Sequence, residues 1–139
     1  MTDLSAHHYG ITVADLDTAV EFYRDTFDLD VLDRFEVSGE AFSEAVGLDG
    51  ATGRFAHLDV DGARIELVEY DPEGTAEPPR SLDQPGAKHL GLAVDDVDEF
   101  YARLPGDAET LSEPQTTSSG ARILGVRDPE GNRVEVIEA

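Results

Sequence analysis

The chain has 139 residues, enough for one domain or for two small half-domains that share a core. It contains 31 Asp and Glu residues against 10 Lys and Arg, a formal net charge of −21, and no cysteine. The lack of cysteine excludes disulfides and thiolate metal ligands, and the negative charge excludes nucleic acid and anionic membranes as partners. No apolar run approaches the roughly 18 residues of a membrane span. The first residues also lack the pattern of a signal peptide, so we expect a cytoplasmic protein.

Apolar residues recur with regular spacing, which favours a folded protein over a disordered acidic chain. Lys88 is the only lysine. Very low lysine with abundant Asp and Glu resembles the composition of halophilic archaeal proteins, in which concentrated salt screens the self-repulsion of the surface. We therefore expect a halophilic protein.

The first predicted strand is HHYGITV, residues 7–13. Asp15 is the expected N-cap of a helix that follows. A short helix is predicted over residues 40–48. The apolar positions of the first helix recur at helical spacing: Leu16, Ala19, Val20, Tyr23 and Phe27.

The first half closes on two strands, GRFAHLDVDG (53–62) and ARIELVEY (63–70). They meet near Asp61 and Gly62, a dipeptide typical of tight hairpins. Four prolines and two glycines in residues 71–87 predict a linker between modules.

The second half repeats the first. KHLGLAV (88–94) is the strand, Asp96 is the equivalent cap, and Glu99 completes a capping-box pattern. ARILGVRD (121–128) and NRVEVIEA (132–139) are the closing strands, joined by the turn sequence DPEGN. The repeat predicts an α+β fold of two βαβββ modules, about 5–70 and 88–139, within one domain; the third strand of each has the weakest signal.

Histidine and glutamate recur at equivalent places in the two modules. His8 and His89 begin equivalent strands, on faces that otherwise carry small residues. Glu66 and Glu135 each stand between two apolar residues near a module's end. Taken singly, such a histidine is usually a surface residue and such a glutamate part of a solvated face. Their joint repetition favours a shared site.

Converging carboxylates repel one another unless a cation lies between them. Two imidazoles and two carboxylates without a thiolate suit a divalent metal such as Ni, Co, Mn, Fe or Zn.

The segments HYGITVADLDTAVEFYRDTFDLDV, RIELVEY, KHLGLAVDDVD and VRDPEGNRVEVIE span almost the whole chain. They resemble the vicinal oxygen chelate superfamily, which includes glyoxalase I, type I extradiol dioxygenases, methylmalonyl-CoA epimerase and fosfomycin- and bleomycin-resistance proteins. The resemblance implies two modules that form a cupped mixed sheet around a metal. It also implies metal ligands at His8, Glu66, His89 and Glu135.

A full His/Glu/His/Glu set is similar to that of glyoxalase I and implies a lyase or isomerase. Its substrate would carry two adjacent oxygens, as a 2-oxoaldehyde hemithioacetal does, and react through a metal-stabilised enediolate. The resemblance makes Glu135 the first choice for the catalytic base and Glu66 the second. The alternatives are an Fe(II) extradiol dioxygenase and a small-molecule binding protein of the same superfamily. No other cofactor is implied.

Some positions depart from the glyoxalase I pattern. Thr12 stands where an arginine is common and Tyr70 where an asparagine is expected, and both weigh against glutathione as the thiol. Lys88 replaces the first histidine of the pair that epimerases usually show in the second module.

Two further histidines and two arginines are candidates for a role in the site. His7 and His57 copy no repeat position and receive no role. Arg64 and Arg133 share faces with the two glutamates, where pairing with surface carboxylates is favoured over a role in the site. We expect a homodimer, with each site lying either in one chain or between two, because a cupped sheet leaves edge strands open.

Overall fold

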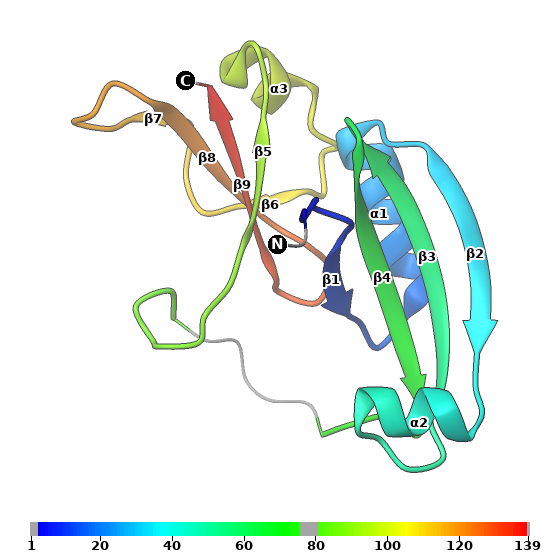
Figure 1. The fold of residues 1–139 in the computed structure, drawn as a ribbon. Coiled ribbons are helices and arrows are strands. Elements are labelled where there is room, and N and C mark those ends of the chain that lie inside the picture. The colour runs from blue at the N-terminus through cyan, green and yellow to red at the C-terminus, as the bar shows by residue number, and fades with distance from the viewer. Residues whose placement is uncertain (1–2, 76–80, 139) are drawn as a thin grey trace. The chain divides into compact units, whose positions relative to one another are not determined.

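The computed structural model describes residues 3–75 and 81–138, and Figure 1 shows the course of the chain. The chain divides into two compact units, residues 1–76 and 77–139. Each unit has one mixed sheet and at least one helix, so the predicted α+β fold is confirmed. In the described residues, none of the helices combines the length and apolar character that a membrane crossing requires.

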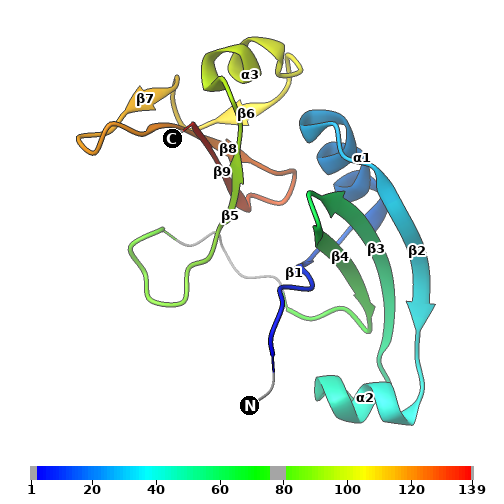
Figure 2. The same cartoon turned by 45° about the horizontal axis from the view of Figure 1, so that its top comes forward.

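The first unit is a four-stranded sheet in the order β1-β4-β3-β2, with α1 against β3 and β4 (Figures 1 and 2). Strand β1 runs parallel to β4, and the other neighbours are antiparallel. Helix α2 lies at the end of the sheet where β4 finishes (Figure 2). The elements are β1 (Tyr9–Thr12), α1 (Leu16–Phe27), β2 (Val31–Val37), α2 (Glu40–Val46), β3 (Thr52–Val60) and β4 (Ala63–Asp71).

The predicted hairpin of β3 and β4 is confirmed. Asp61 and Gly62 form its two-residue turn with φ of 44° and 89°. Positive φ at both central residues is the type I′ geometry, whose twist matches that of the flanking strands. The turn therefore fixes which residues of β3 and β4 face each other.

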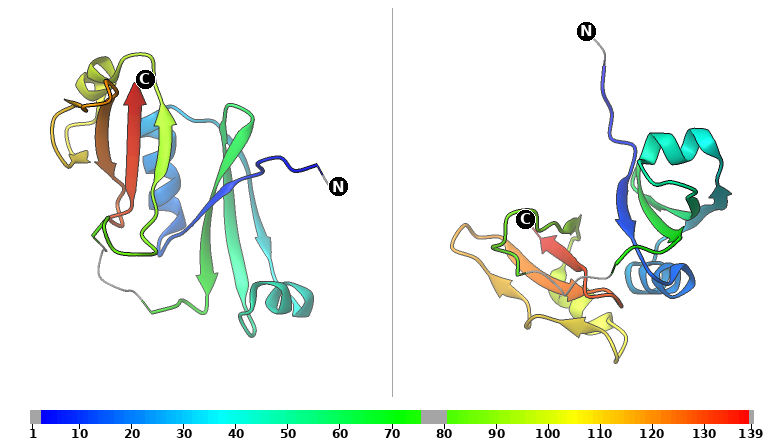
Figure 3. Two further views of the ribbon diagram at one scale, coloured as in Figure 1. Left: turned by 60° about the vertical axis from the view of Figure 1, so that its left-hand side comes forward. Right: turned by 90° about the horizontal axis from the view of Figure 1, so that it is seen from below.

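The second unit repeats this plan in the order β5-β9-β8-β6, with β5 parallel to β9 (Figure 3). The weakly predicted third strand is split into two short pieces, β6 and β7, which both pair with β8. The sequence between them, LSEP, contains a proline, which limits strand length. The elements are β5 (Leu90–Ala93), α3 (Val97–Arg103), β6 (Glu109–Thr110), β7 (Gln115–Thr116), β8 (Arg122–Arg127) and β9 (Arg133–Glu138).

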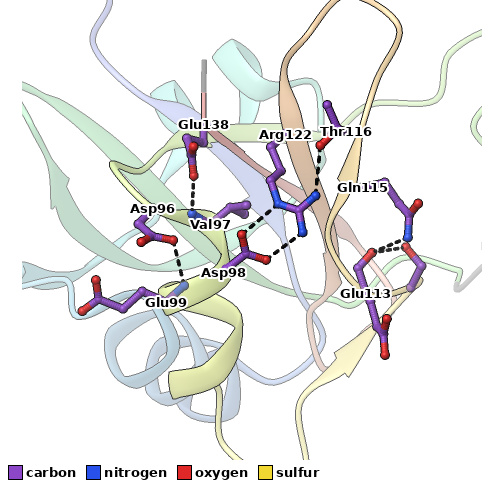
Figure 4. Close-up of polar contacts among 10 residues, drawn as sticks. Asp96, Val97, Asp98, Glu99, Glu113, Gln115, Thr116, Arg122 and Glu138 are labelled. Carbon is purple, nitrogen blue, oxygen red and sulfur yellow. Dashed lines mark hydrogen bonds and ion pairs between the residues drawn. The ribbon is translucent and has the colours of Figure 1, made fainter.

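Both predicted N-caps are confirmed. Asp15 accepts a hydrogen bond from the Thr18 amide at 3.1 Å, and Asp96 accepts one from the Glu99 amide at 3.0 Å (Figure 4). The Glu99 side chain, however, forms an ion pair with Arg103, one helical turn along. Asp96 is therefore the N-cap as predicted, whereas the glutamate half of the predicted capping box is not formed, because Glu99 pairs with Arg103 on the exposed helix surface.

The apolar faces of the two sheets form the cores. In the first unit Leu16, Tyr23 and Leu67 are at most 2% exposed, and in the second Val97, Val126 and Val134 are fully buried. Burying one such side chain contributes about 1.5–3 kcal/mol. Each sheet thus has one face under a helix, and the opposite face is where the repeated polar residues stand.

Candidate functional site

The repeated glutamates occupy the same place in each sheet, and His8 and His89, expected to begin their strands, each stand one residue before the strand starts. Gly10 pairs with Glu66 between β1 and β4, and Gly91 pairs with Glu135 between β5 and β9. Side chains alternate along these strands, so the neighbours of both glutamates are buried under the helix while the glutamates point the other way. The predicted faces are confirmed.

Each glutamate contacts the histidine of its own unit. In the first unit, His8 Nε2 lies 3.5 Å from Glu66 Oε1. In the second, His89 Nε2 lies 3.5 Å from Glu135 Oε2. The two pairs are therefore built from the same register and have the same spacing, as the sequence repeat predicts.

His57 is a partner of Glu66 that the sequence analysis left without a role. Strand β3 places His57 directly opposite Glu66, and its Nε2 lies 2.7 Å from Glu66 Oε2. His57 is only 6% exposed, so this contact is buried. Its other nitrogen, Nδ1, lies 3.2 Å from a guanidinium nitrogen of Arg64. Both carboxylate oxygens of Glu66 thus face an imidazole, Oε1 toward His8 and Oε2 toward His57.

The second unit has a glycine where the first has His57. Gly125 on β8 pairs with Glu135. A Cβ at Gly125 would lie 2.8 Å from Leu111 Cδ1 and 3.5 Å from Arg133 Nε, so these two side chains fill the space above it. That Nε is buried and has no hydrogen-bond partner among the described residues. The arginines therefore differ: Arg64 reaches a histidine, and Arg133 packs over a glycine.

An aromatic cluster adjoins the Glu66 pair on the open face of the first sheet. It consists of Phe35, Phe42, Phe55 and Tyr70. Phe35 stacks on Phe55 with centroids 5.1 Å apart, and Phe42 stacks on Tyr70 at 6.4 Å. Gly53 makes room for them, because a Cβ there would lie 2.6 Å from the Phe55 ring. Tyr70, where an asparagine was expected, is therefore part of an apolar wall.

The residues of each pair fit a divalent metal. Imidazole nitrogen and carboxylate oxygen bind such ions at about 2.1 Å. Two donors on one ion therefore lie between about 3.0 Å apart at right angles and about 4.2 Å apart on opposite sides. The 3.5 Å spacing of both His–Glu pairs falls in this range. In residues 3–75 and 81–138 no group of three or more His, Asp or Glu side chains is arranged to hold a metal.

The structure brings His8 to Glu66 and His89 to Glu135, and a single site of all four residues remains a prediction. His7 lies beside His8, with their Nδ1 atoms 2.7 Å apart. Thr12 is exposed on the same face of β1 as Gly10.

Comparison with known proteins supports the resemblance seen in the sequence. The glyoxalase/bleomycin resistance protein/dioxygenase superfamily matches residues 5–136. A 2-epi-5-epi-valiolone epimerase from Actinomyces sp. is 32% identical over 96% of this chain and 79% of its own length. The crystal structure of a glyoxalase family protein from Bacillus cereus covers 99% of this chain and 95% of its own, with 25% identity and a TM-score of 0.87.

The trypanothione-dependent glyoxalase I of Leishmania major is similar in fold, with a TM-score of 0.68 and 23% identity over 98% of this chain and 87% of its own. The matched region contains both modules and both His–Glu pairs. The chain belongs to the glyoxalase/bleomycin resistance protein/dioxygenase superfamily.

Proposed function

We propose that this protein is a metal-dependent isomerase or lyase that moves a proton next to a carbonyl group in a small substrate with two adjacent oxygens. The observation that carries the proposal is the repetition of one His–Glu pair at the same register and the same 3.5 Å spacing in both units. His8, Glu66, His89 and Glu135 would hold the metal, with the histidines as neutral imidazoles. A divalent cation, when bound there, stabilises negative charge on the substrate's oxygens.

The residues of the chain then have separate tasks. Glu135 takes a proton from the carbon beside the carbonyl; the electron pair of the broken C–H bond forms a C=C bond, and the carbonyl π pair moves onto the oxygen. The same carboxyl returns the proton to the neighbouring carbon while the hydroxyl proton on the first carbon moves to the second oxygen, so no other reactant is consumed. The aromatic cluster of Phe35, Phe42, Phe55 and Tyr70 supports a compact substrate whose carbon skeleton packs against an apolar wall.

A second outcome of the same chemistry is epimerisation, in which the proton returns to the other face of the same carbon. The 32% identity with an enzyme named as an epimerase favours this form. Lys88 does not copy the doubled histidine of the epimerase pattern, whereas the full His/Glu/His/Glu set supports both forms.

Proton transfer itself is the property to test. The purified protein is analysed for bound metals and then incubated in D₂O with two substrates, methylglyoxal plus a thiol and a cyclic 2-hydroxyketone. We expect deuterium at the carbon beside the carbonyl, with net isomerisation for the first substrate or inversion for the second. Glu135→Gln should slow this exchange by about 10²–10⁴-fold, the usual contribution of a general base.

Two further assays, of oxygen uptake and of small-molecule binding by the metal-free protein, separate this function from the alternatives. Oxygen uptake with ring opening of a catechol would indicate a dioxygenase in place of an isomerase. Tight binding of a small molecule by the metal-free protein, with no deuterium exchange, would indicate a binding protein. Either result would contradict the proposal.

A further inference from the structure

The two halves of the repeated site differ at one position. Glu66 stands opposite His57 on β3, whereas Glu135 stands opposite Gly125 on β8. Glu66 therefore has an imidazole on each oxygen, at 3.5 Å and 2.7 Å. In the described residues of the second unit, the ion pair with His89 at 3.5 Å is the contact that holds Glu135.

The contacts of His57 define where its proton lies. Arg64 approaches His57 Nδ1 at 3.2 Å, and a guanidinium has only hydrogen-bond donors. Nδ1 must then accept, so it carries no proton. In the neutral ring the proton is on Nε2, which donates to Glu66 Oε2 at 2.7 Å. Arg64 thus donates a hydrogen bond to His57, and His57 donates one to Glu66.

Packing holds the ring of His57 in this orientation. Its side chain is 7% exposed. The edge of the ring meets Phe35 at an interplanar angle of 83° and a centroid distance of 5.1 Å, while His8 stacks on it at 6.0 Å. A buried donor that packs against these two rings restricts the carboxylate it binds.

We infer that His57, oriented by Arg64, is a positioning residue that fixes Glu66 in one orientation, so that Glu66 stays a metal ligand while Glu135 is left to move the proton. The inference rests on the proposed function and deepens it by giving the two equivalent glutamates different tasks. The division follows from the chain itself, since the position opposite Glu135 holds a glycine. Groups that orient a metal ligand typically contribute 10–100-fold to metal affinity.

The first test reads the imidazole proton in the metal-free protein by ¹⁵N NMR. We expect the wild-type His57 ring to carry a proton on Nε2 and none on Nδ1. Arg64→Met, a change at an exposed position, should give a mixture of both tautomers. A wild-type His57 with a proton on Nδ1 would overturn the inference.

The second test measures Co²⁺ affinity by calorimetry and the visible spectrum of the bound Co²⁺. His57→Leu should lower affinity by about 10–100-fold and change the spectrum. His57→Gln, which restores an N–H donor at similar reach, should recover most of both. The matched control is Thr12→Val, an uncharged change on the same sheet face, which should leave both unchanged. Equal affinity and equal spectra for wild type and His57→Leu would contradict the positioning role.

The two tests separate failure of this inference from failure of the proposed function. A wild type that binds neither Co²⁺ nor another divalent ion would remove the proposed function, and the metal-free NMR result would still decide the orientation of His57. A wild type that binds Co²⁺ while His57→Leu binds it equally well would keep the function and remove the inference. Thermal unfolding of each variant shows whether a loss comes from misfolding; if His57→Leu unfolds, Arg64→Met and His57→Gln carry the test.

Discussion

Glu69 and Leu16 join the first sheet to its helix: Glu69 Oε1 accepts a hydrogen bond from the backbone N–H of Leu16 at 3.0 Å. Glu138 and Val97 repeat this contact in the second unit at 2.8 Å (Figure 4). Each of these glutamates stands three residues after a proposed metal ligand on the same strand. Because side chains alternate along a strand, an odd spacing puts these two side chains on opposite faces. Each strand end therefore binds the helix on one face and carries the proposed ligand on the other.

Removing one of these contacts should destabilise the fold. We expect Glu138→Ala to lower the free energy of unfolding by about 1.5–3 kcal/mol, because hydrogen bonds to charged groups contribute about that much and Val97, whose N–H loses its acceptor, is buried. Urea unfolding at fixed salt measures the change. Glu109→Ala, at an exposed position on β6, is the control and should have little effect. Equal changes in both variants would mean that the contact between Glu138 and Val97 contributes no stability of its own.

Local sequence signals predicted most of the fold. Asp15 and Asp96 were identified as caps because short acceptor side chains preceded a helical apolar stripe, and the structure confirms both. The division of the third strand into β6 and β7 could not be predicted, because neither two-residue piece has a periodic pattern of its own. Pairing with β8 defines these pieces, and that pairing is a tertiary effect.

The sequence also contains a signal for the place of His57. His57 lies four residues before Asp61, and Glu66 lies four residues after Gly62. A two-residue hairpin turn makes residues equidistant from it partners, so Asp61-Gly62 already placed His57 opposite Glu66. The aromatic cluster had no such signal, since it depends on how Phe42 of α2 folds back onto Phe55 and Tyr70.

The ion pair between Asp98 and Arg122 should make stability depend on pH. The hydrogen bonds from Arg122 hold the pKa of Asp98 below its ordinary value of 3.8. A carboxyl whose pKa is lower in the folded state contributes stability above the unfolded pKa and loses it as pH falls through the folded one. Asp98→Asn should therefore unfold at lower urea than wild type at pH 7, with the gap narrowing below about pH 3.8. A gap that stays constant down to pH 2 would show that the charge of Asp98 plays no part.

Salt should stabilise the whole protein. With 31 acidic residues against 10 basic ones, repulsion dominates at low ionic strength, where the Debye length is about 30 Å at 0.01 M. At 1 M it is about 3 Å, and most exposed charges no longer interact. We expect the melting temperature to rise continuously from dilute buffer to 2 M KCl, and stability to be lost below molar salt. An unchanged melting temperature over that range would contradict a halophilic protein.

We expect the protein to be a homodimer. The sheets leave β1, β2 and β5 and the short β6 and β7 at their edges, and β2 exposes Val31, Leu32 and Phe35, which are 36%, 49% and 37% accessible. Exposed edges with apolar side chains are usually covered in natural proteins. Light scattering in high salt measures the mass. A monomer that still binds one metal ion per chain would contradict the expected homodimer.

The last prediction concerns whether one chain or two supply the four proposed ligands. Residues 71–87 are long enough for either arrangement, because 17 residues span roughly 50 Å when extended. The test is a mixed dimer in which one chain carries His8→Ala with Glu66→Gln and the other carries His89→Ala with Glu135→Gln. If sites form between chains, the His8–Glu66 pair of one chain meets the His89–Glu135 pair of the other. The mixed dimer then regains one metal ion and about half the wild-type activity.

Each doubly substituted homodimer is the control and should bind no metal at the site. A well-formed mixed dimer that regains neither metal nor activity would place all four ligands in a single chain. Because each His–Glu pair is complete within its own unit, the substitutions in one unit leave the other pair intact. Recovery therefore depends only on which chains supply the two pairs. We expect the recovery to appear with Co²⁺ alone, before any substrate is added, since holding the metal requires only the four side chains.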